Sequence, residues 1–577
     1  MYVIALAADY DGTLAEDGIV SPGTIEALEQ FRNSGRRLIM VTGRELPELL
    51  EIFPRIDLFE RVIAENGALL YEPAARSERK LASPASPELY QALKARGVAP
   101  LSAGRCIIAT REPHQNTVLE EIRRLGLELE IIFNKGAVMV LPSGVNKATG
   151  LAAALDELRL SPHNVAAIGD AENDHAFLQF CGCDAAVANA LPPLREKAHL
   201  VMQQPRGRGV AEFVRRIEKD NGALMPAERH SVVLGTANGH EISLPAFGRT
   251  VLIAGRSGIG KSKTATALME DMGAKKFQFC VFDPEGDYRE LENAICVGDT
   301  KMPPSQEEIC KLLEAGDNVV INTLGIAVPD RPAFFKQIFP KIFGLRARLA
   351  RPHWLIFDEA HHVLPADREG ADAAMPDDFG AAILITVHPE AVSTASLKTV
   401  ETVIAIGPHA PETISAYCKK TGRKTPHGIK APGDDEVLYW KVEEADPMPV
   451  RVRKPQQEHK RHTRKYAEGT LPEQQSFYFR GPENRLNLRA QNTTIFLQIA
   501  QGVDDATWEY HLRKGEYSRW FRDFIKDEEL ADEIAAIEED RSLSPEQSRE
   551  RIADAVKQRY TAPAGAPESI DPQPAAR

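Results

Sequence analysis

Cysteine is scarce in this sequence and never stands in a pattern typical of metal binding or of a disulfide framework. The seven cysteines are scattered along 577 residues, no CxxC occurs, and Cys181 and Cys183 are too close for ordinary pairing. We therefore expect reduced thiols, as in cytoplasmic proteins.

Long apolar runs and an excess of positive charge are also missing. No apolar run approaches the ~20 residues that span a bilayer. The first segment, "MYVIALAADYDG", passes from a short apolar run directly into acidic residues, which is not typical of a signal peptide. The net charge of −13 argues against a surface coated with nucleic-acid-binding charge and leaves only a local basic patch open. We expect a cytoplasmic protein without a membrane partner.

The length requires several domains, because single cores usually stop growing at roughly 250–300 residues. No internal repeat is visible. Residues 1–220 and 230–445 each alternate short β-rich runs with helical patterns, which is typical of α/β domains. Residues 446–475 read as a basic linker and 476–560 as a mainly α-helical module. The Ala/Pro-rich tail, 561–577, is expected to be disordered.

Acidic and polar residues follow the predicted parallel strands of the first stretch. The segment "DYDGTL" places Asp9 and Asp11 after the first strand, "VTGR" places Thr42 after the second, and "GDAENDHAFL" places Asp170 and Asp174 after a later one. In doubly wound sheets, ligands bind at the carboxyl edge of the strands. We therefore expect these side chains to line one site.

The two N-terminal aspartates suit phosphoryl transfer. Asp9 is a candidate nucleophile that attacks phosphorus through its carboxylate. Asp11, two residues on, points to the same side and is a candidate general acid and then base. Taken alone, this segment has an alternative reading as an Asp-Gly turn without a catalytic role.

Phosphate binding beside several carboxylates requires positive charge. Mg²⁺ prefers oxygen ligands and would offset the repulsion between carboxylates and phosphate. Lys147, in "VNKATG" at the start of a predicted helix, and Thr42 would hold the phosphate oxygens. The candidate ligands of this Mg²⁺ are Asp9, Asp11, Asp170 and Asp174.

These motifs occur in the order Asp9-x-Asp11-Gly-Thr, Thr42, Lys147 and Gly169-Asp170-x-x-Asn173-Asp174. The set resembles the haloacid dehalogenase superfamily of phosphatases over residues 1–218. The flanks "AENGALLY" and "LPSGVNKATGL" resemble the branch with archaeal-type phosphoglycolate phosphatases and sucrose-phosphate phosphatases. The resemblance implies a Rossmann-like core, a small α/β cap at about 75–140, and an aspartyl-phosphate intermediate. Tyr10 departs mildly from the family pattern, and a degenerate scaffold domain is the alternative.

A phosphate-binding loop opens the second stretch. The segment "GRSGIGKS" satisfies G-x-x-x-x-G-K-[ST] and stands between the β-rich "RTVLIA" and the helical "KSKTATALMEDMG". Backbone N–H groups would cradle the phosphates of ATP, Lys261 would reach the β and γ oxygens, and Ser262 would bind Mg²⁺. The candidate nucleotide-binding residues are Gly255, Ser257, Gly258, Gly260, Lys261, Ser262 and Lys263.

A second acidic motif completes the nucleotide site. In "WLIFDEAHH", Asp358 would hold Mg²⁺ through water, and Glu359 would polarise the attacking water. With "CVFDPEGDYREL" and "DEAHHVLP", residues 232–440 resemble the HerA/FtsK group of P-loop ATPases. The resemblance implies a RecA-like domain in a hexameric homo-oligomer. A sensor strand of that group ends in Thr-Gln, whereas here Thr386 precedes Val387.

In ATPases of this group an arginine from the neighbouring subunit completes each site. The sequence does not rank the candidates for this role, which are Arg346, Arg348 and Arg423.

A dense basic run extends from Arg451 to Lys465. It is either a solvated linker or a contact for nucleic acid or an acidic partner. The aromatic residues that follow, Trp508 and Trp520 among them, have the helical spacing typical of a core.

Three functions follow from these motifs. The favoured one is a Mg²⁺-dependent phosphatase for a small phosphorylated metabolite, which the oligomeric ATPase regulates or drives. The second is a nucleic-acid translocase with an accessory phosphatase, and the third is an ATP-switched scaffold. DNA-stimulated ATP hydrolysis would favour the second, whereas nucleotide binding without turnover would favour the third.

Overall fold

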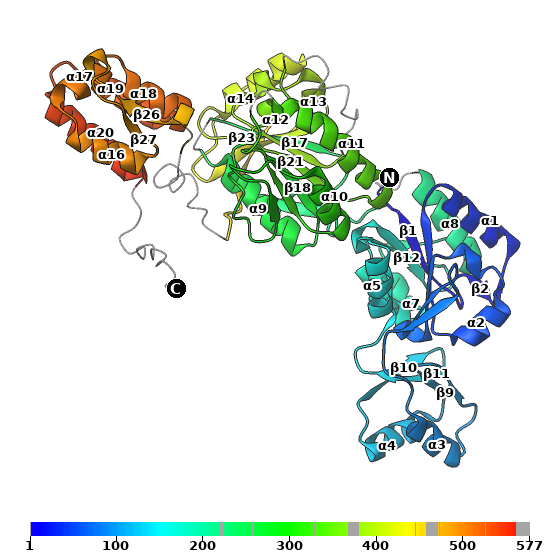
Figure 1. Ribbon diagram of the computed structural model, residues 1–577. Coiled ribbons are helices and arrows are strands. Elements are labelled where there is room, and N and C mark those ends of the chain that lie inside the picture. The colour runs from blue at the N-terminus through cyan, green and yellow to red at the C-terminus, as the bar shows by residue number, and fades with distance from the viewer. Residues whose placement is uncertain are drawn as a thin grey trace, which may run out of the picture.

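The computed structural model describes residues 2–219, 224–256, 259–327, 330–366, 380–444, 446–456, 471, 473–525 and 527–560. Two large sheets and a helical module follow one another along the chain (Figure 1). The α/β class expected for the first two parts and the helical class of the third are confirmed.

The first sheet is the N-terminal core, with strand order β14-β13-β12-β1-β4-β5-β6-β7. Strands β12, β1, β4 and β5 are parallel neighbours and are buried almost throughout, as near-continuous apolar strands are in doubly wound folds. The strands are β1 (Ala5–Asp9), β4 (Arg37–Val41), β5 (Arg61–Ala64), β6 (Leu69–Glu72), β7 (Ser77–Lys80), β12 (Val165–Gly169), β13 (Cys183–Ala186) and β14 (Leu200–Val201).

Helices of this core begin where sequence signals place them. Ser21 caps the first helix by accepting the N–H of Thr24, and Pro22 opens it. Asn146 caps α5 through a reciprocal pair of hydrogen bonds with Thr149. The helices are α1 (Pro22–Asn33), α2 (Leu46–Ile52), α5 (Lys147–Glu157), α6 (His175–Phe180), α7 (Pro192–Lys197) and α8 (Arg206–Lys219).

Between β7 and α5 the chain builds a separate cap with its own small core of leucine, isoleucine and valine. Figure 1 shows this cap at the end of the core where the parallel strands finish. Strand β7 falls within the range expected for the cap, yet it pairs with β6 in the core sheet. The cap elements are α3 (Pro87–Ala95), β8 (Ser102–Ala103), β9 (Ile108–Arg111), α4 (Gln115–Leu125), β10 (Leu129–Asn134) and β11 (Ala137–Pro142).

The second sheet has eleven strands in the order β16-β15-β25-β24-β23-β17-β22-β21-β18-β20-β19. From β23 to β19 the strands are parallel, and an antiparallel extension follows on the other side. The parallel strands are β17 (Thr250–Ala254), β18 (Phe279–Asp283), β19 (Ile295–Val297), β20 (Val319–Asn322), β21 (Trp354–Phe357), β22 (Ala382–Thr386) and β23 (Val400–Ile406).

Sequence patterns did not reveal the antiparallel extension, which begins at a hairpin just before the phosphate-binding loop. Its last strand lies in the range expected to be a linker. The strands are β15 (Ser231–Ala237), β16 (His240–Pro245), β24 (Glu436–Lys441) and β25 (Met448–Val452). The helices of this second domain are α9 (Lys261–Ala274), α10 (Gln306–Ala315), α11 (Arg331–Leu349), α12 (Ala360–Val363), α13 (Thr394–Lys398) and α14 (Ala410–Thr421).

The C-terminal module packs its helices around buried aromatic rings. Trp508 stacks on Tyr517, and Trp520 stacks on Phe496. Its elements are β26 (Phe477–Phe479), β27 (Leu488–Ala490), α16 (Thr493–Gly502), α17 (Asp505–Leu512), α18 (Glu516–Trp520), α19 (Glu528–Glu539) and α20 (Pro545–Tyr560). The expected disorder of residues 561–577 lies outside the described residues.

The N-terminal core and the second domain meet through the starts of their strands. Asn164, directly before β12, and His353, directly before β21, are joined by a 3.1 Å bond between Oδ1 and Nε2. His163 Nε2 lies 2.7 Å from the carbonyl of Lys275, which caps α9, and the His163 ring stacks on Phe277 at 4.0 Å. This joint is therefore a specific buried contact between two domains.

Three histidines sit in this joint, and burial lowers the pKa of each. The pKa of His230 falls to about 4, and those of His163 and His353 are also lowered. His230 is held in its neutral form, because Nδ1 faces the Tyr2 hydroxyl at 2.9 Å and Nε2 faces the Gly182 carbonyl at 2.8 Å. Protonation would place a charge in an apolar, aromatic contact.

We predict that acid weakens this joint. The pKa of a histidine in the unfolded chain is about 6.5, whereas the pKa of His230 in the folded protein is about 4. The unfolded chain therefore binds the proton first, and the free energy of unfolding falls as the pH drops from about 6.5 to about 4. At pH 5 the loss from His230 alone is about 2 kcal/mol. Denaturant unfolding between pH 7.5 and 5 measures it. His230→Gln should flatten the pH dependence, whereas substitution of the exposed His240 should not; equal slopes in both variants would contradict the prediction.

Candidate functional site

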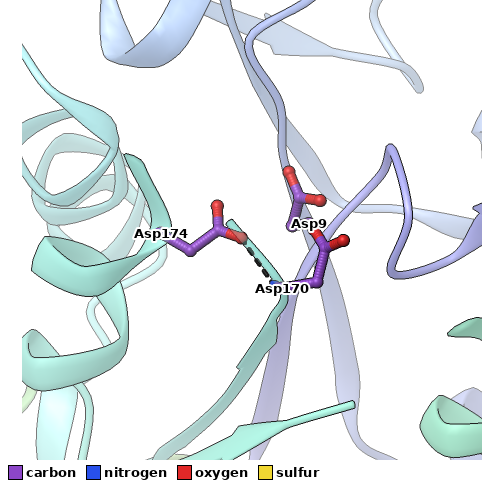
Figure 2. Close-up of side chains that lie close together, drawn as sticks. All are labelled: Asp9, Asp170 and Asp174. Atoms are coloured by element: carbon purple, nitrogen blue, oxygen red, sulfur yellow. Dashed lines mark hydrogen bonds between the residues drawn. The ribbon is translucent and has the colours of Figure 1, made fainter. Parts of the chain in front are cut away.

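Three buried aspartates converge at the carboxyl edge of the N-terminal core (Figure 2). Asp9 ends β1, Asp170 follows β12, and Asp174 lies in the turn η4 (Glu172–Asp174). One carboxylate oxygen from each lies within 4.8 Å of the others. The three aspartates that the sequence places after these strands therefore lie together and form a compact acidic cluster.

Lys147 neutralises part of this cluster. Its Nζ donates at 2.6 Å to Asp9 Oδ1 and at 2.6 Å to Asp174 Oδ1, and the side chain is buried at the start of α5. Burial opposes the charged lysine, but the Asp174 and Asp9 carboxylates outweigh burial and raise the pKa of Lys147. The lysine is therefore a fixed cation beside Asp9.

Lys147 alone does not balance three carboxylates. Burial, followed by the Asp174 charge, raises the pKa of Asp9 to about 8. Burial also raises the pKa of Asp170. Additional positive charge at the cluster would favour the ionised Asp9 that nucleophilic attack requires.

The donor set fits Mg²⁺, which takes oxygen ligands. Asp9 and Asp170 offer carboxylate oxygens, and a Cβ on Gly12 would lie 2.2 Å from Asp170 Oδ2, so glycine keeps a cradle open there. Asp174 is engaged by protein donors: Oδ2 accepts the N–H groups of Asp170 and Ala171, and Oδ1 accepts from Lys147. Asp174 is thus better suited to position Lys147 and the Asp170 loop than to bind a metal.

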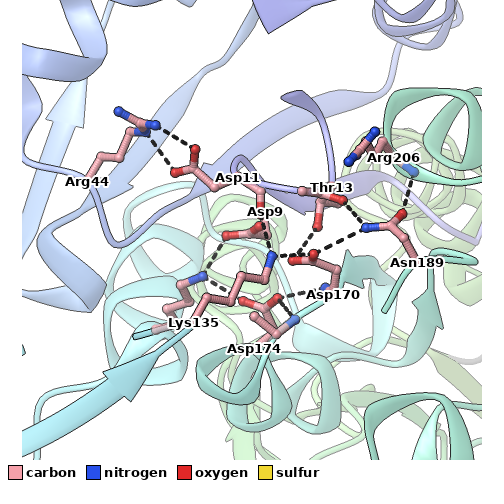
Figure 3. A network of polar contacts seen from close by, with 12 residues as sticks. Asp9, Asp11, Thr13, Arg44, Lys135, Asp170, Asp174, Asn189 and Arg206 are labelled. Atoms are coloured by element: carbon pink, nitrogen blue, oxygen red, sulfur yellow. Dashed lines mark hydrogen bonds and ion pairs between the residues drawn. The ribbon is translucent and has the colours of Figure 1, made fainter. Parts of the chain in front are cut away.

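Asp11 lies outside this cluster. Its carboxylate forms two 2.7 Å bonds with Arg44 and is partly exposed (Figure 3). Arg44 follows Thr42, whose buried hydroxyl accepts the N–H of Arg44 at 3.2 Å. The structure therefore brings Asp9, Asp170, Asp174 and Lys147 together and leaves Asp11 paired with an arginine nearby.

Three contributors to this site were missed in the sequence: Arg44, Lys135 and Asn189. Asn189 donates to the Gly12 carbonyl at 2.9 Å. Lys135 reaches the cluster from the cap, where its Nζ lies 2.5 Å from Asp170 Oδ2 and 3.3 Å from the Asp11 carbonyl (Figure 3). Nothing local in "FNKGAV" signals this contact, because it depends on how the cap folds over the core.

The phosphate-binding loop of the second domain leads into α9. Gly260 adopts a left-handed conformation before the helix, and the Lys261 Nζ donates to the Arg256 carbonyl at 2.8 Å. Ser257 and Gly258 lie outside the described residues. Of the other predicted nucleotide-binding residues, Gly255 follows β17, whereas Ser262 and Lys263 lie in the first turn of α9.

Acidic residues from β18 and β21 gather beside this loop. Burial raises the pKa of Asp358 well above its ordinary value, and the charges of Glu359, Asp287 and Asp283 add to this. A cluster of this kind favours a cation. The pKa of the buried Tyr288 is raised by burial and by Asp358, which places this tyrosine among the same acids.

Glu359 stands at the start of α12 with a left-handed backbone. His361 Nδ1 lies 3.4 Å from Glu359 Oε2 and 3.1 Å from the Thr386 hydroxyl at the end of β22. Because β22 lies between β17 and β21, the sensor position contacts the DEAHH segment through His361. Sequence reasoning did not single out this histidine.

The candidate trans arginines differ in their surroundings. Arg346 donates to the carbonyls of Pro352, His353 and Ala381, at the edge of the sheet opposite the nucleotide loop. It therefore serves the fold. Arg348 is exposed, and Arg423 donates to a neighbouring carbonyl at 3.4 Å, so these two remain candidates.

The described part of the basic run is largely paired. Arg453 contacts Asp271 at 3.0 Å, and Lys454 contacts Asp435 at 2.9 Å. Arg451 lies in β25. The rest of the run, including Lys460, Arg461, Arg464 and Lys465, lies outside the described residues.

The seven cysteines are unpaired with one another. Within the described chain, no helix has the length and apolarity needed to cross a bilayer.

The fold and the acidic cluster define a phosphotransferase-type hydrolase core joined to a P-loop ATPase domain. A family model described as haloacid dehalogenase-like hydrolase matches residues 6–105 and 99–214, and one described as helicase HerA, central domain, matches residues 236–336. The chain belongs to the haloacid dehalogenase-like hydrolases and carries a HerA-type domain behind that hydrolase. Both resemblances expected from the motifs, and their fusion, are confirmed.

Individual relatives match the N-terminal part. The phosphoglycolate phosphatase of Methanothermobacter thermautotrophicus is 34% identical over 222 residues, covering 37% of this chain and 97% of the relative. Phosphoglycolate phosphatase 2 of Saccharolobus solfataricus is 29% identical over 232 residues, covering 38% and 94%. A crystal structure of a haloacid dehalogenase-like hydrolase from Bacteroides thetaiotaomicron aligns with 37% of this chain and 98% of its own, at 20% identity and a TM-score of 0.33. The hydrolase family model and the phosphatase relatives identify the protein as a phosphoric monoester hydrolase, and the HerA model identifies its ATPase domain.

Proposed function

We propose that this protein is a Mg²⁺-dependent phosphatase that hydrolyses a small phosphorylated acid of the phosphoglycolate type, and that its ATPase domain regulates it. The observation that carries this proposal is Asp9 beside a buried lysine and two further aspartates at the carboxyl edge of the core. The matched relatives named phosphoglycolate phosphatase support the substrate class.

In the proposed mechanism Asp9 is the nucleophile. A carboxylate oxygen of Asp9 forms a bond to phosphorus while the ester P–O bond breaks, and Asp11, which takes up a proton from solvent when it leaves Arg44, gives that proton to the departing alkoxide. Asp11 then takes a proton from water, which attacks phosphorus, breaks the aspartyl-phosphate bond and releases phosphate. Bound Mg²⁺, held by Asp9 and Asp170, would neutralise charge on the phosphoryl oxygens.

Two residues set conditions for these steps. Lys147 holds Asp9 in place and offers its ammonium group to the phosphoryl oxygens. Arg44 holds the Asp11 carboxylate away from the acidic cluster, so Asp11 has to leave Arg44 before it can serve the leaving group. Substrate binding is the event that would release Asp11.

The joint between the domains supports regulation. The phosphate-binding loop precedes α9, and the helix is capped at its other end by Lys275, whose carbonyl contacts His163. His163 and Asn164 in turn precede β12, which ends at Gly169, one residue before Asp170. A displacement of α9 on nucleotide binding could therefore be transmitted to the acidic cluster through the contact between Lys275 and His163 and then along β12.

A substrate panel tests the function. Phosphatase activity is measured on small phosphorylated acids, sugar phosphates and an aryl phosphate, with and without ATP and with and without single- and double-stranded DNA. Turnover of phosphorylated acids that changes with ATP and ignores DNA is expected. ATP hydrolysis stimulated by DNA, with phosphatase turnover unaffected by ATP, would favour the translocase instead. Nucleotide binding without hydrolysis would favour the scaffold.

A further inference from the structure

We infer that Lys135 on the cap, together with Asn66 on the core, binds a second anionic group of the substrate, next to the phosphate that Asp9 attacks. This inference rests on the proposed phosphatase function and assigns the residues that select its substrate class. The class is a phosphate ester that carries a carboxylate or a similar acid within a few bonds of the ester oxygen.

The first observation is the reach of Lys135. It lies in the turn between β10 and β11, and its ammonium group contacts Asp170 Oδ2 and the Asp11 carbonyl on the other side of the site (Figure 3). Among the described cap residues, Lys135 alone hydrogen-bonds to a carboxylate of the aspartate cluster. The side chain remains 43% exposed, so the ammonium group is accessible to a molecule entering beneath the cap.

The second observation is a set of buried amide atoms without partners at the same boundary. Asn66 and Asn173 are joined by one 2.8 Å bond, which leaves Asn66 Nδ2 and Asn173 Oδ1 buried and unsatisfied. Asn134 Oδ1, directly before Lys135, is also unsatisfied. Exchanging O and N in the first two amides still leaves one donor and one acceptor, and a buried polar atom without a partner is destabilising.

Close packing places these amides between the cap and the core. Asn66 follows β5, and its N–H donates to the Thr42 carbonyl at 3.0 Å, so it lies next to the strand end that carries Thr42. At Gly43, a Cβ would lie 3.5 Å from Met139 Sδ on the cap strand β11 and 3.7 Å from Asn173 Nδ2. Asn66 and Asn173 therefore lie where cap strand β11 meets the core, at the same boundary that Lys135 crosses to reach Asp170.

Charge explains why these groups suit an anion that the acidic cluster itself would repel. A phosphoryl group on Asp9 is served by Lys147 and by the cation that the carboxylates bind. A carboxylate a few bonds away would meet the negative charge of Asp170 and would need a counter-charge of its own, because Arg44 is already paired with Asp11. Lys135 and the Asn66 amide supply a charge and a donor there, and hydrogen bonds to charged groups are the stronger ones.

The test compares two substrates of similar size in the full-length protein: 2-phosphoglycolate, and ethyl phosphate, which lacks the carboxylate. Lys135→Met keeps the length of the side chain and removes the charge. We expect kcat/KM for 2-phosphoglycolate to fall about 10- to 100-fold, mainly through KM, and kcat/KM for ethyl phosphate to stay within about threefold. Lys135→Arg should restore most of the discrimination.

Controls separate this inference from stability and from the proposed function. Lys94→Met, on the exposed face of the cap helix α3, should change neither substrate. Equal losses on both substrates would assign Lys135 to the aspartate cluster in general, and no loss on either would remove it from the site; both overturn the inference. Failure of the wild-type protein to hydrolyse any phosphate ester would instead overturn the phosphatase function, so the two failures are distinguishable.

Discussion

Asp9→Asn is expected to abolish phosphate ester hydrolysis, with a loss in kcat on the order of 10³-fold or more. The amide is nearly isosteric and still accepts a hydrogen bond from the Lys147 ammonium group, but it cannot form the aspartyl-phosphate bond. Removing one of three buried carboxylates also relieves repulsion, so the melting temperature should not fall. Stopped-time phosphate release on the best substrate of the panel measures the effect.

A matched variant makes this result specific. Asp17 stands in the same loop region, is exposed and has a left-handed backbone that asparagine tolerates. Asp17→Asn should retain full phosphatase activity. ATP hydrolysis should be retained in both variants, because the second site is built from other strands. More than a tenth of the wild-type phosphatase activity in Asp9→Asn would remove Asp9 from the role of nucleophile.

Glu359→Gln should bind ATP and hydrolyse it roughly 10²- to 10⁴-fold more slowly, the usual contribution of a general base. Lys261→Ala should weaken nucleotide binding itself, because the charge that faces the phosphates is lost. Equilibrium binding of a fluorescent ATP analogue and phosphate release separate the two effects. Glu412→Gln, at an exposed position of α14, is the control and should behave as wild type.

The same variant tests assembly. We propose a homo-oligomer, a hexamer in the HerA-like manner, whose sites are completed by an arginine from the neighbouring subunit, with Arg348 and Arg423 as candidates. Glu359→Gln with ATP and Mg²⁺ should hold this assembly together for mass photometry. A strictly monomeric profile, together with wild-type ATP turnover independent of protein concentration, would contradict the proposal and favour the scaffold function.

Much of the first site could be predicted because its residues follow strands that can be recognised locally. Asp9 and Asp170 stand at the ends of buried apolar runs, Asp174 follows in the next turn, and parallel strands bring such positions to one edge. The position of the Asp11 side chain could not be predicted from its place after a strand. Spacing puts it near Asp9, but the side-chain direction depends on Arg44, which lies on another strand end.

Contacts made by separately folded parts could not be predicted at all. Lys135 belongs to a hairpin of the cap, and its partner Asp170 belongs to the core, 35 residues further on in the chain. The histidines of the joint look like ordinary polar residues in "SPHNV" and "RPHWL". Their burial and lowered pKa values arise only when two domains pack strand start against strand start.

The packing of the two domains at this joint determines how far apart the two active sites lie, and therefore whether small molecules can pass directly between them. Parallel strands that abut at their beginnings point their ends in opposite directions, so Asp170 and Asp358 lie at the two far ends of a β12–β21 stack. At about 3.3 Å per residue, the strands alone separate them by roughly 30 Å. At that separation we expect phosphate cleaved from ATP to leave one site before it can reach the other. Any coupling between the sites would then act through displacement of the protein, and each site would exchange its small molecules with solvent independently.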